Sequence, residues 1–398
     1  MNDRFRTFDQ TNHQTSRLAL FAAIALACTA GLASAQQSAS HAAADEAAQV
    51  APSDSAILTF FQNTEVSGFV DGYYSYNFNK PASRRAGNER NFDVQHNSFS
   101  LNMAELALEK KPTANSRGGF RLDLDYGQAQ TIVNASEPGD RTVLQNLGQA
   151  YVSYLIAPGS GLQIDFGKFV TPAGFEVIKT KDDWNYSRSL LFANAIPYYH
   201  MGLRAAFNVG SKLALTGYLV NGWNNVLDNN TAKTMAAQAT VKPFGSLVIV
   251  ENYIGGPEQP NDNQTWRHLS DTVVTYTVTP HLSLGGNYDY GRDKQTGAKV
   301  TWQGFAGYAR FQPSGWFAVS PRAEIFSDPE GLITGMAQTI KEFTLTGELK
   351  SKDGVIFRLE YRRDFSDIIF FAKNASRPSK QQNTFTGGLV YYFSSKTP

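Results

Sequence analysis

Hydrophobic and polar residues alternate with a period of two through most of the chain, beginning near residue 66. In one clear stretch, Leu122, Leu124 and Tyr126 alternate with Asp123 and Asp125. Strict alternation is typical of a β-strand with one apolar and one polar face. About sixteen segments, within a range of about 14–18, follow this pattern. They start near Val66, Phe99, Gly118, Gln149, Leu162, Met201, Leu213, Met235, Leu247, Thr272, Leu282, Val300, Phe317, Thr339, Val355 and Asn383.

The connections between these segments alternate between long and short. The long ones lie near 79–97, 128–147, 171–199, 221–233, 255–270, 291–299, 327–338 and 363–382. The short ones are rich in residues that favour tight turns and lie near 110–112, 158–161, 210–211, 243–246, 279–281, 313–315 and 352–354. Long loops at one end and tight turns at the other are typical of outer-membrane barrels.

Alternation alone does not say which face of the strands meets water. In a soluble sandwich the apolar face forms the core, whereas in a membrane barrel it meets lipid. Aromatic residues crowd near the predicted strand ends, as in interfacial girdles: Tyr73, Tyr74, Tyr76, Phe78, Tyr288, Tyr290, Tyr391, Tyr392 and Phe393. We therefore predict an all-β fold, a single transmembrane antiparallel β-barrel over residues 65–393. Long extracellular loops, short periplasmic turns and periplasmic ends complete the predicted topology.

The N-terminus has the pattern of a cleaved secretory signal peptide over residues 1–35. Arg17 precedes an apolar run that ends with the small residues Ala33, Ser34 and Ala35, as at a signal cleavage site. The alternative is a membrane anchor helix. Residues 36–64 are predicted to form a flexible periplasmic lead-in, and residues 394–398 a C-terminal tail. Cleavage after Ala35 would leave 33 basic and 33 acidic residues and no cysteine.

Composition excludes several classes of protein. The 398 residues include 36 Lys and Arg against 35 Asp and Glu, whereas a nucleic-acid-binding protein has a basic excess. The single apolar run does not suffice for a bundle of membrane helices, which needs several. The one cysteine excludes a disulfide framework or a cysteine-rich metal cluster.

Several stretches together resemble the OmpL-like β-barrel porin family of Gram-negative bacteria. They are Val66–Asn79, Gly167–Glu176, Trp184–Phe192, Pro197–Arg204, Leu219–Lys233 and Pro321–Gly331. The resemblance spans roughly residues 65–393 and implies an outer-membrane porin without naming a solute. Separately, Thr384–Phe393 resembles the terminal strand by which such proteins are recognised for insertion, although residues 394–398 follow it.

The third long connection, residues 171–199, is the first candidate for a functional site. A barrel of about sixteen strands leaves a water channel, and a loop folded into it would narrow it and select solutes. The alternatives are a surface loop, or a salt-bridge cluster that only holds the loop's shape. The candidate constriction residues are Glu176, Lys179, Lys181, Asp182, Asp183 and Arg188.

The polar face of the strands supplies a second set of candidates, the lumen wall. Its predicted charges are Asp71, Arg121, Asp123, Asp125, Asp165, Lys168, Arg204, Lys242, Arg322, Glu324, Arg358, Glu360 and Arg362. Lys168 is out of phase with Asp165. Charge pairs on neighbouring strands stabilise a wet wall, a structural role that accounts for most of this set. Because both signs occur, we expect weak ion selectivity.

Enzyme signals are poor, and we predict neither catalysis nor a cofactor or metal. The histidines have no metalloprotease spacing, and His200 near Ser187 and Ser189 is the one hydrolase candidate. The sequence predicts a passive porin for small hydrophilic solutes and ions. The alternatives are an adhesive or structural barrel and a barrel hydrolase. Expected partners are outer-membrane lipid, the barrel-assembly machinery and the solutes, with no nucleic acid; the oligomeric state stays open.

Overall fold

The computed structural model describes residues 63–87, 89–137, 144–156, 161–295, 297–374 and 377–396. The predicted signal peptide and all but the last two residues of the predicted lead-in lie outside these ranges. Within them, no helix has the length and apolar character needed to cross a membrane.

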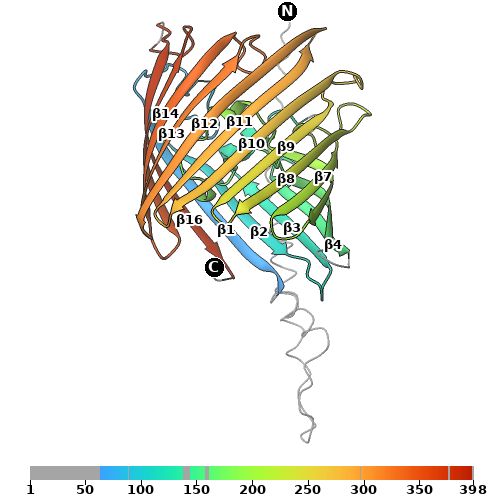
Figure 1. Ribbon diagram of the computed structural model, residues 1–398. Helices are drawn as coiled ribbons and strands as arrows, with labels where there is room; N and C mark the ends of the chain where they lie inside the picture. The colour runs from blue at the N-terminus through green and yellow to red at the C-terminus, as the bar shows by residue number, and fades with distance from the viewer. Residues whose placement is uncertain are drawn as a thin grey trace, which may run out of the picture. The chain divides into compact units, whose positions relative to one another are not determined.

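The described chain forms one closed antiparallel sheet (Figure 1). Each strand pairs with its neighbours in sequence, and β1 pairs with β16 to close the barrel, with Ser67 opposite Ser394 and Asn77 opposite Thr384. The sixteen strands are β1 (Glu65–Asn77), β2 (Ser98–Lys110), β3 (Gly118–Tyr126), β4 (Leu147–Ile156), β5 (Leu162–Val170), β6 (Tyr199–Asn208), β7 (Leu213–Val220), β8 (Thr234–Phe244), β9 (Leu247–Pro257), β10 (Trp266–Thr279), β11 (Leu282–Gln295), β12 (Ala298–Ser314), β13 (Phe317–Asp328), β14 (Gln338–Lys350), β15 (Val355–Ser366) and β16 (Gln381–Ser394). The predicted barrel of about sixteen strands is confirmed.

The apolar face of the strands lies on the outside of the barrel. In β15, Phe357 and Leu359 are exposed, whereas Arg358 and Glu360 between them are buried. A water-soluble sandwich would bury the apolar side chains, so this arrangement fits a barrel whose outer surface meets lipid.

Long and short connections alternate as predicted, with one exception. We call the two ends of the barrel the long-connection end and the short-turn end. The predicted long connection at 291–299 is wrong, because β11 and β12 are separated only by residues 296–297. The ladder between them continues from Asp293, opposite Val300, to Gln295, opposite Ala298. The hairpin is rich in polar residues, so it lacks the apolar alternation from which the strands were predicted.

The start of β10 was also predicted too late, near Thr272. The strand begins at Trp266 and pairs with β9 from there. His268 breaks the apolar alternation at this point, and the Tyr253 hydroxyl lies 2.7 Å from its Nδ1 atom.

A β-bulge in β2 shifts which side chains point inward. The register with β1 skips Asn102, since Asp71 lies opposite Met103 and Gly72 opposite Leu101. One extra residue reverses the alternation on the bulged strand. Glu105, which simple alternation would place on the apolar face of this strand, is therefore buried inside the barrel.

Two residues of the predicted aromatic girdles face the interior of the barrel, Tyr73 and Tyr392, and Tyr392 packs against the buried apolar cluster. Tyr73 shares a face with the buried Asp71 and Ser75 and is itself buried. Its ring centroid lies 5.7 Å from that of Tyr186.

Residues 89–97 of the first long connection fold back into the barrel. The Arg90 guanidinium lies 2.8 Å from the Asp364 carboxylate of β15, and Phe92 is buried. Glu89 is buried beside the same carboxylate. Burial, reinforced by the negative charge of Asp364, raises the pKa of Glu89 to about 7.

This shift predicts a decline in stability with rising pH. A raised pKa means that the folded protein binds the proton more tightly than the unfolded chain, so the stabilisation is complete below the ordinary carboxyl range and is lost as the pH rises through about 7. Glu89→Gln is expected to remove on the order of 3 kcal/mol of that pH dependence. Thermal unfolding in detergent at pH 5 and pH 8 measures it.

Asp353→Asn is the control, because it removes a carboxylate from an exposed turn and is expected to keep the wild-type dependence. Equal pH dependence in wild type and Glu89→Gln would contradict the prediction.

Candidate functional site

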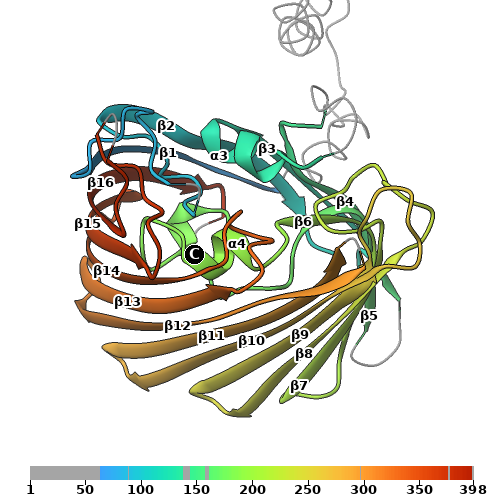
Figure 2. The same cartoon turned by 90° about the horizontal axis from the view of Figure 1, so that it is seen from above.

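Residues 171–198, which we call the inner loop, lie inside the barrel. They include the 3-10 helix η1 (Thr180–Asp182) and the helix α4 (Leu190–Asn194). Helix α4 begins after Ser189, whose hydroxyl accepts a hydrogen bond from the Phe192 backbone N–H at 2.9 Å, a standard N-cap. Figure 2 shows α4 within the ring of strands. The sequence left open whether this connection folds into the lumen or lies on the surface, and in the structure it folds into the lumen.

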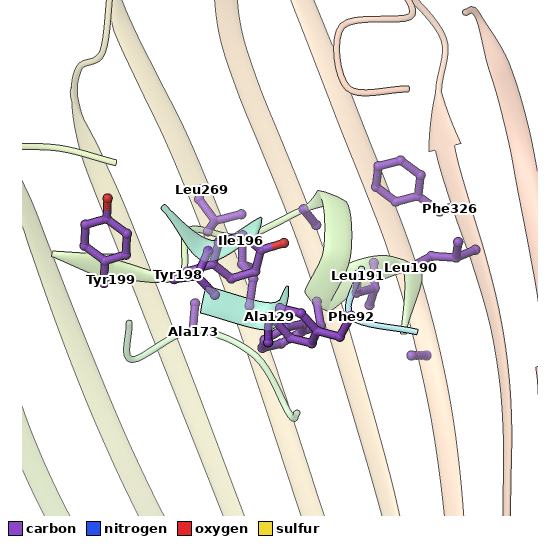
Figure 3. Close-up of a cluster of buried hydrophobic side chains, with 14 of the residues drawn as sticks. Phe92, Ala129, Ala173, Leu190, Leu191, Ile196, Tyr198, Tyr199, Leu269 and Phe326 are labelled. Atoms are coloured by element: carbon purple, nitrogen blue, oxygen red, sulfur yellow. The ribbon is translucent and has the colours of Figure 1, made fainter. Parts of the chain in front are cut away.

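An apolar cluster fixes α4 in the interior (Figure 3). Leu190 and Leu191 are fully buried and belong to the same cluster as Phe92 and Phe326. Each such side chain contributes about 1.5–3 kcal/mol when removed from water. The short helix α3 (Gln128–Val133) adds further buried side chains to this cluster. Apolar residues of several connections and strands thus form a core inside an otherwise polar lumen.

Two wall carboxylates hold the backbone of the inner loop. Glu324 of β13 accepts the Leu190 N–H at 2.8 Å. Glu360 of β15 accepts the N–H groups of Tyr186 and Ser187 at 2.7 and 3.0 Å. A buried backbone N–H group needs an acceptor, so these contacts fix the position of the loop against the wall.

Wall arginines bind the backbone carbonyls of the same loop. Arg358 donates to the carbonyls of Thr180 and Asp183 at 2.6 and 2.5 Å. Arg362 donates to the Arg188 carbonyl at 2.5 Å. Both signs of wall charge therefore anchor one segment of main chain.

Three of the predicted constriction residues are buried within this framework. Glu176 lies 2.6 Å from Arg322 of β13. Arg188 lies 3.1 Å from Asp183 and also donates to three backbone carbonyls of the inner loop. For Asp183 and Arg188, the contacts correspond to the salt-bridge cluster that holds the loop's shape.

A cavity of about 1120 Å³ lies between the inner loop and the wall formed largely by β2–β6. Lys111 and Lys352 line it in turns at the short-turn end. Gln130 of α3 and Phe192 of α4 line it deeper in the barrel. The polar interior is therefore divided into a packed side, where the loop is anchored, and an open side along β2–β6.

Lys179 extends from the inner loop to the wall of this cavity. Its ammonium lies 2.6 Å from Glu105 Oε2 and 3.0 Å from Asp123 Oδ2. Burial disfavours the charged form, but the carboxylates of Asp123 and Glu105 outweigh it and hold the pKa of Lys179 above its ordinary value. Lys179 therefore stays a cation at neutral pH.

The structure divides the predicted site residues into groups. Those that line the cavity are Glu176, Lys179, Lys181, Asp182, Arg121, Asp123, Asp125 and Arg204. Those that are buried in anchoring or paired contacts away from the lining are Asp71, Asp165, Asp183, Arg188, Arg322, Glu324, Arg358, Glu360 and Arg362.

Two predicted wall lysines have other positions. Lys168 is buried, and its ammonium donates to Asn134 Oδ1 at 3.0 Å and to the Leu147 carbonyl at 2.7 Å. Lys242 is exposed near the short-turn end of β8.

Sequence reasoning missed Glu105 and Glu109, which also line the cavity. The bulge at Asn102 explains the omission, because simple alternation places Glu105 among apolar neighbours. One signal was available. Glu109 lies opposite Arg121 in the strand register, so their opposite charges could have placed Glu109 on the inner wall.

The hydrolase candidates have separate partners. His200 Nδ1 lies 2.9 Å from the Gly222 carbonyl, the Ser187 hydroxyl accepts from Arg322 at 3.1 Å, and Ser189 caps α4. Within the described ranges, no group of three or more His, Cys, Asp or Glu side chains is placed to hold a metal ion.

Solved structures show the same fold at low sequence identity. An anion-selective porin from Comamonas acidovorans has a TM-score of 0.60 at 11% identity, covering 83% of this chain and 99% of that one. OmpT of Vibrio cholerae has a TM-score of 0.54 at 11% identity, covering 83% and 97%. The outer-membrane channel DcaP of Acinetobacter baumannii has a TM-score of 0.54 at 10% identity, covering 83% and 97%. No curated protein matches the chain in sequence.

A family model described as "Putative beta-barrel porin-2, OmpL-like" matches residues 63–393. This range contains nearly the whole barrel, from before β1 into β16. The resemblance seen in the sequence is thus confirmed, and the chain belongs to the OmpL-like family of outer-membrane β-barrel porins.

Proposed function

We propose that this porin is a passive channel through which small hydrophilic solutes and ions diffuse without a chemical step. The observation that carries the proposal is the cavity beside the inner loop, which is lined by charged side chains of both signs. A polar, water-accessible passage within a lipid-facing barrel has the character of a diffusion pore.

In this proposal the passage follows β2–β6, and the cavity-facing part of the inner loop forms its constriction. Lys179, Lys181 and Asp182 then act on passing ions, while Arg188 keeps the loop in place. The charged wall residues of β13 and β15 hold the inner loop in place through their hydrogen bonds to its backbone.

The same proposal includes export and assembly. Residues 1–35 serve as a cleaved signal, residues 36–64 remain as a periplasmic lead-in, and the barrel-assembly machinery inserts the strands. The long-connection end then faces the outside of the cell, as the tight turns of such barrels face the periplasm.

Shortening the inner loop tests the constriction. Deletion of Lys179–Arg188 removes the segment that crosses the lumen between Glu105 and Glu360. Single-channel conductance in planar bilayers is expected to rise by about twofold or more, because the open area grows. Liposome swelling is expected to admit larger sugars.

A deletion of residues 260–264, in the connection between β9 and β10, is the matched control and is expected to leave conductance near the wild-type value. Unchanged conductance in the inner-loop deletion, with normal insertion, would place the constriction elsewhere.

Ion selectivity provides a second test. The cavity lining contains eight acidic and seven basic residues, so the net field on a passing ion is small. We expect a cation-to-anion permeability ratio within about threefold of unity, because exposed charges are screened at 0.1 M salt. Reversal potentials in a KCl gradient measure the ratio, and a strong preference for either ion would contradict the assigned lining.

Cysteine labelling tests the orientation. Lys373 lies in the long connection between β15 and β16, and Lys212 lies in the turn between β6 and β7; both side chains are exposed. A membrane-impermeant maleimide added to intact cells is expected to label Lys373→Cys and to leave Lys212→Cys unlabelled until the cells are opened. The reverse pattern would invert the proposed topology.

A further inference from the structure

Charged side chains on β11–β15 are sorted by sign between the two faces of the sheet. Along these strands, buried residues that face the lumen alternate with exposed residues that face outward. Every acidic residue of these strands is buried on the lumen side, as Asp293, Glu342 and Asp364 illustrate. The charged residues on the outer side are all basic: Arg292, Lys294, Lys299, Lys341 and Arg363. The outer face of this part of the barrel is therefore positively charged.

These basic residues lie at the long-connection end of the barrel, just beyond exposed aromatic side chains. Each is within three residues of the strand boundary at that end. On β11, the exposed Tyr290 precedes Arg292 by two residues. On β15, the exposed Tyr361 precedes Arg363 in the same way. Aromatic side chains of membrane barrels gather where the hydrocarbon meets the headgroups, so the basic residues are placed at the level of the lipid headgroups.

The densest part of this charge lies on the hairpin of β11 and β12. Lys294 stands directly opposite Lys299 in the strand register, and Arg292 is two residues from Lys294 on the same face. All three side chains are exposed. Asp293, between the two basic residues of β11, points into the lumen, where Arg267 binds it at 2.8 Å. Like charges directly opposite each other on neighbouring strands are destabilising, so this hairpin carries a repulsion that an anion would relieve.

Two carboxylates of the neighbouring connections bind backbone groups rather than this face. Glu330 accepts hydrogen bonds from the backbone N–H of Thr301 at 2.8 Å and from its hydroxyl at 3.2 Å. Asp367 accepts the backbone N–H of Thr339 at 2.9 Å. Within the described ranges, neither carboxylate forms an ion pair. The positive charge of the outer face therefore remains open to an anion from outside the chain.

From this placement we propose that Arg292, Lys294 and Lys299 form a binding site for the phosphate groups of an anionic membrane lipid. A phosphate between the two ammonium groups would relieve their repulsion, and a guanidinium group binds phosphate oxygens in a bidentate manner. Lys341 and Arg363 extend the positive surface along the barrel, and clusters of this kind attract anionic headgroups. The partner is a lipid because these side chains face away from the lumen, on the surface that meets the membrane. The inference goes beyond the proposed function, since it concerns the outer face and not the passage of solutes.

Lipid A, a phosphorylated glycolipid, is the probe. The purified full-length protein in a neutral detergent is titrated with it, and binding is measured by microscale thermophoresis. The hairpin variant, Lys294→Gln with Lys299→Gln, is expected to bind about tenfold more weakly than wild type, because both ammonium contacts to phosphate are lost.

The matched control is Lys212→Gln with Lys242→Gln. It removes the same charge from exposed positions at the short-turn end and is expected to keep the wild-type affinity. Lys294→Arg with Lys299→Arg retains both charges and is expected to bind within about twofold of wild type. This second variant separates loss of charge from a disturbed hairpin, because both replacements alter the same two positions.

Two further ligands distinguish the sources of phosphate. Dephosphorylated lipid A is expected to bind wild type as weakly as the hairpin variant binds lipid A, and inorganic phosphate is expected not to displace lipid A at equal concentration. Equal affinity of the hairpin and control variants for lipid A would overturn the site. Full affinity for the dephosphorylated lipid would show apolar contact alone, and displacement by inorganic phosphate would show a free-anion site; either result would also overturn the proposal.

Discussion

The hydrogen bonds between β1 and β16 are the constraint on which the rest of the structure depends. A strand edge inside lipid leaves backbone N–H and C=O groups unsatisfied, and each costs several kcal/mol. The pairing from Ser67 with Ser394 to Asn77 with Thr384 removes both edges at once. Because the sheet is closed, every second side chain of each strand points into the lumen, where a buried charged group needs an ion-pair or hydrogen-bond partner.

The interior meets this requirement unevenly around the barrel. On β13 and β15, wall residues bind the backbone of the inner loop, with Glu324 and Glu360 as acceptors and Arg358 as a donor. On β2 and β3, the carboxylates outnumber the cations of the wall and border the cavity. One loop therefore packs against one side of the lumen and leaves the other side polar and accessible.

Sequence reasoning succeeded where the signal was local. Alternation at period two identified the strands of the closed sheet and the inward direction of residues such as Arg358 and Asp123. It failed at Glu105, because a single inserted residue at Asn102 reverses the alternation. It also could not separate Lys179, which lines the cavity, from Arg188, which is buried.

The reason for that last failure is distance along the chain. Nothing near Tyr186 reveals that its N–H binds Glu360, 174 residues later. Arg90 and Asp364 are likewise 274 residues apart. The sequence near Arg90 therefore does not indicate that the first long connection folds inward. Partners of this kind are specified by closure of the sheet, which no short window of sequence contains.

The anchoring of the inner loop through its main chain has a consequence for how such a protein can diversify. Glu324, Glu360 and Arg358 bind N–H and C=O groups, which every residue type except proline provides in full. Loop side chains outside the apolar cluster and the buried ion pairs can therefore change while the path of the loop across the lumen is kept. The charge at position 179 can therefore change, and with it the solutes that the channel passes, while the fold of the barrel stays the same.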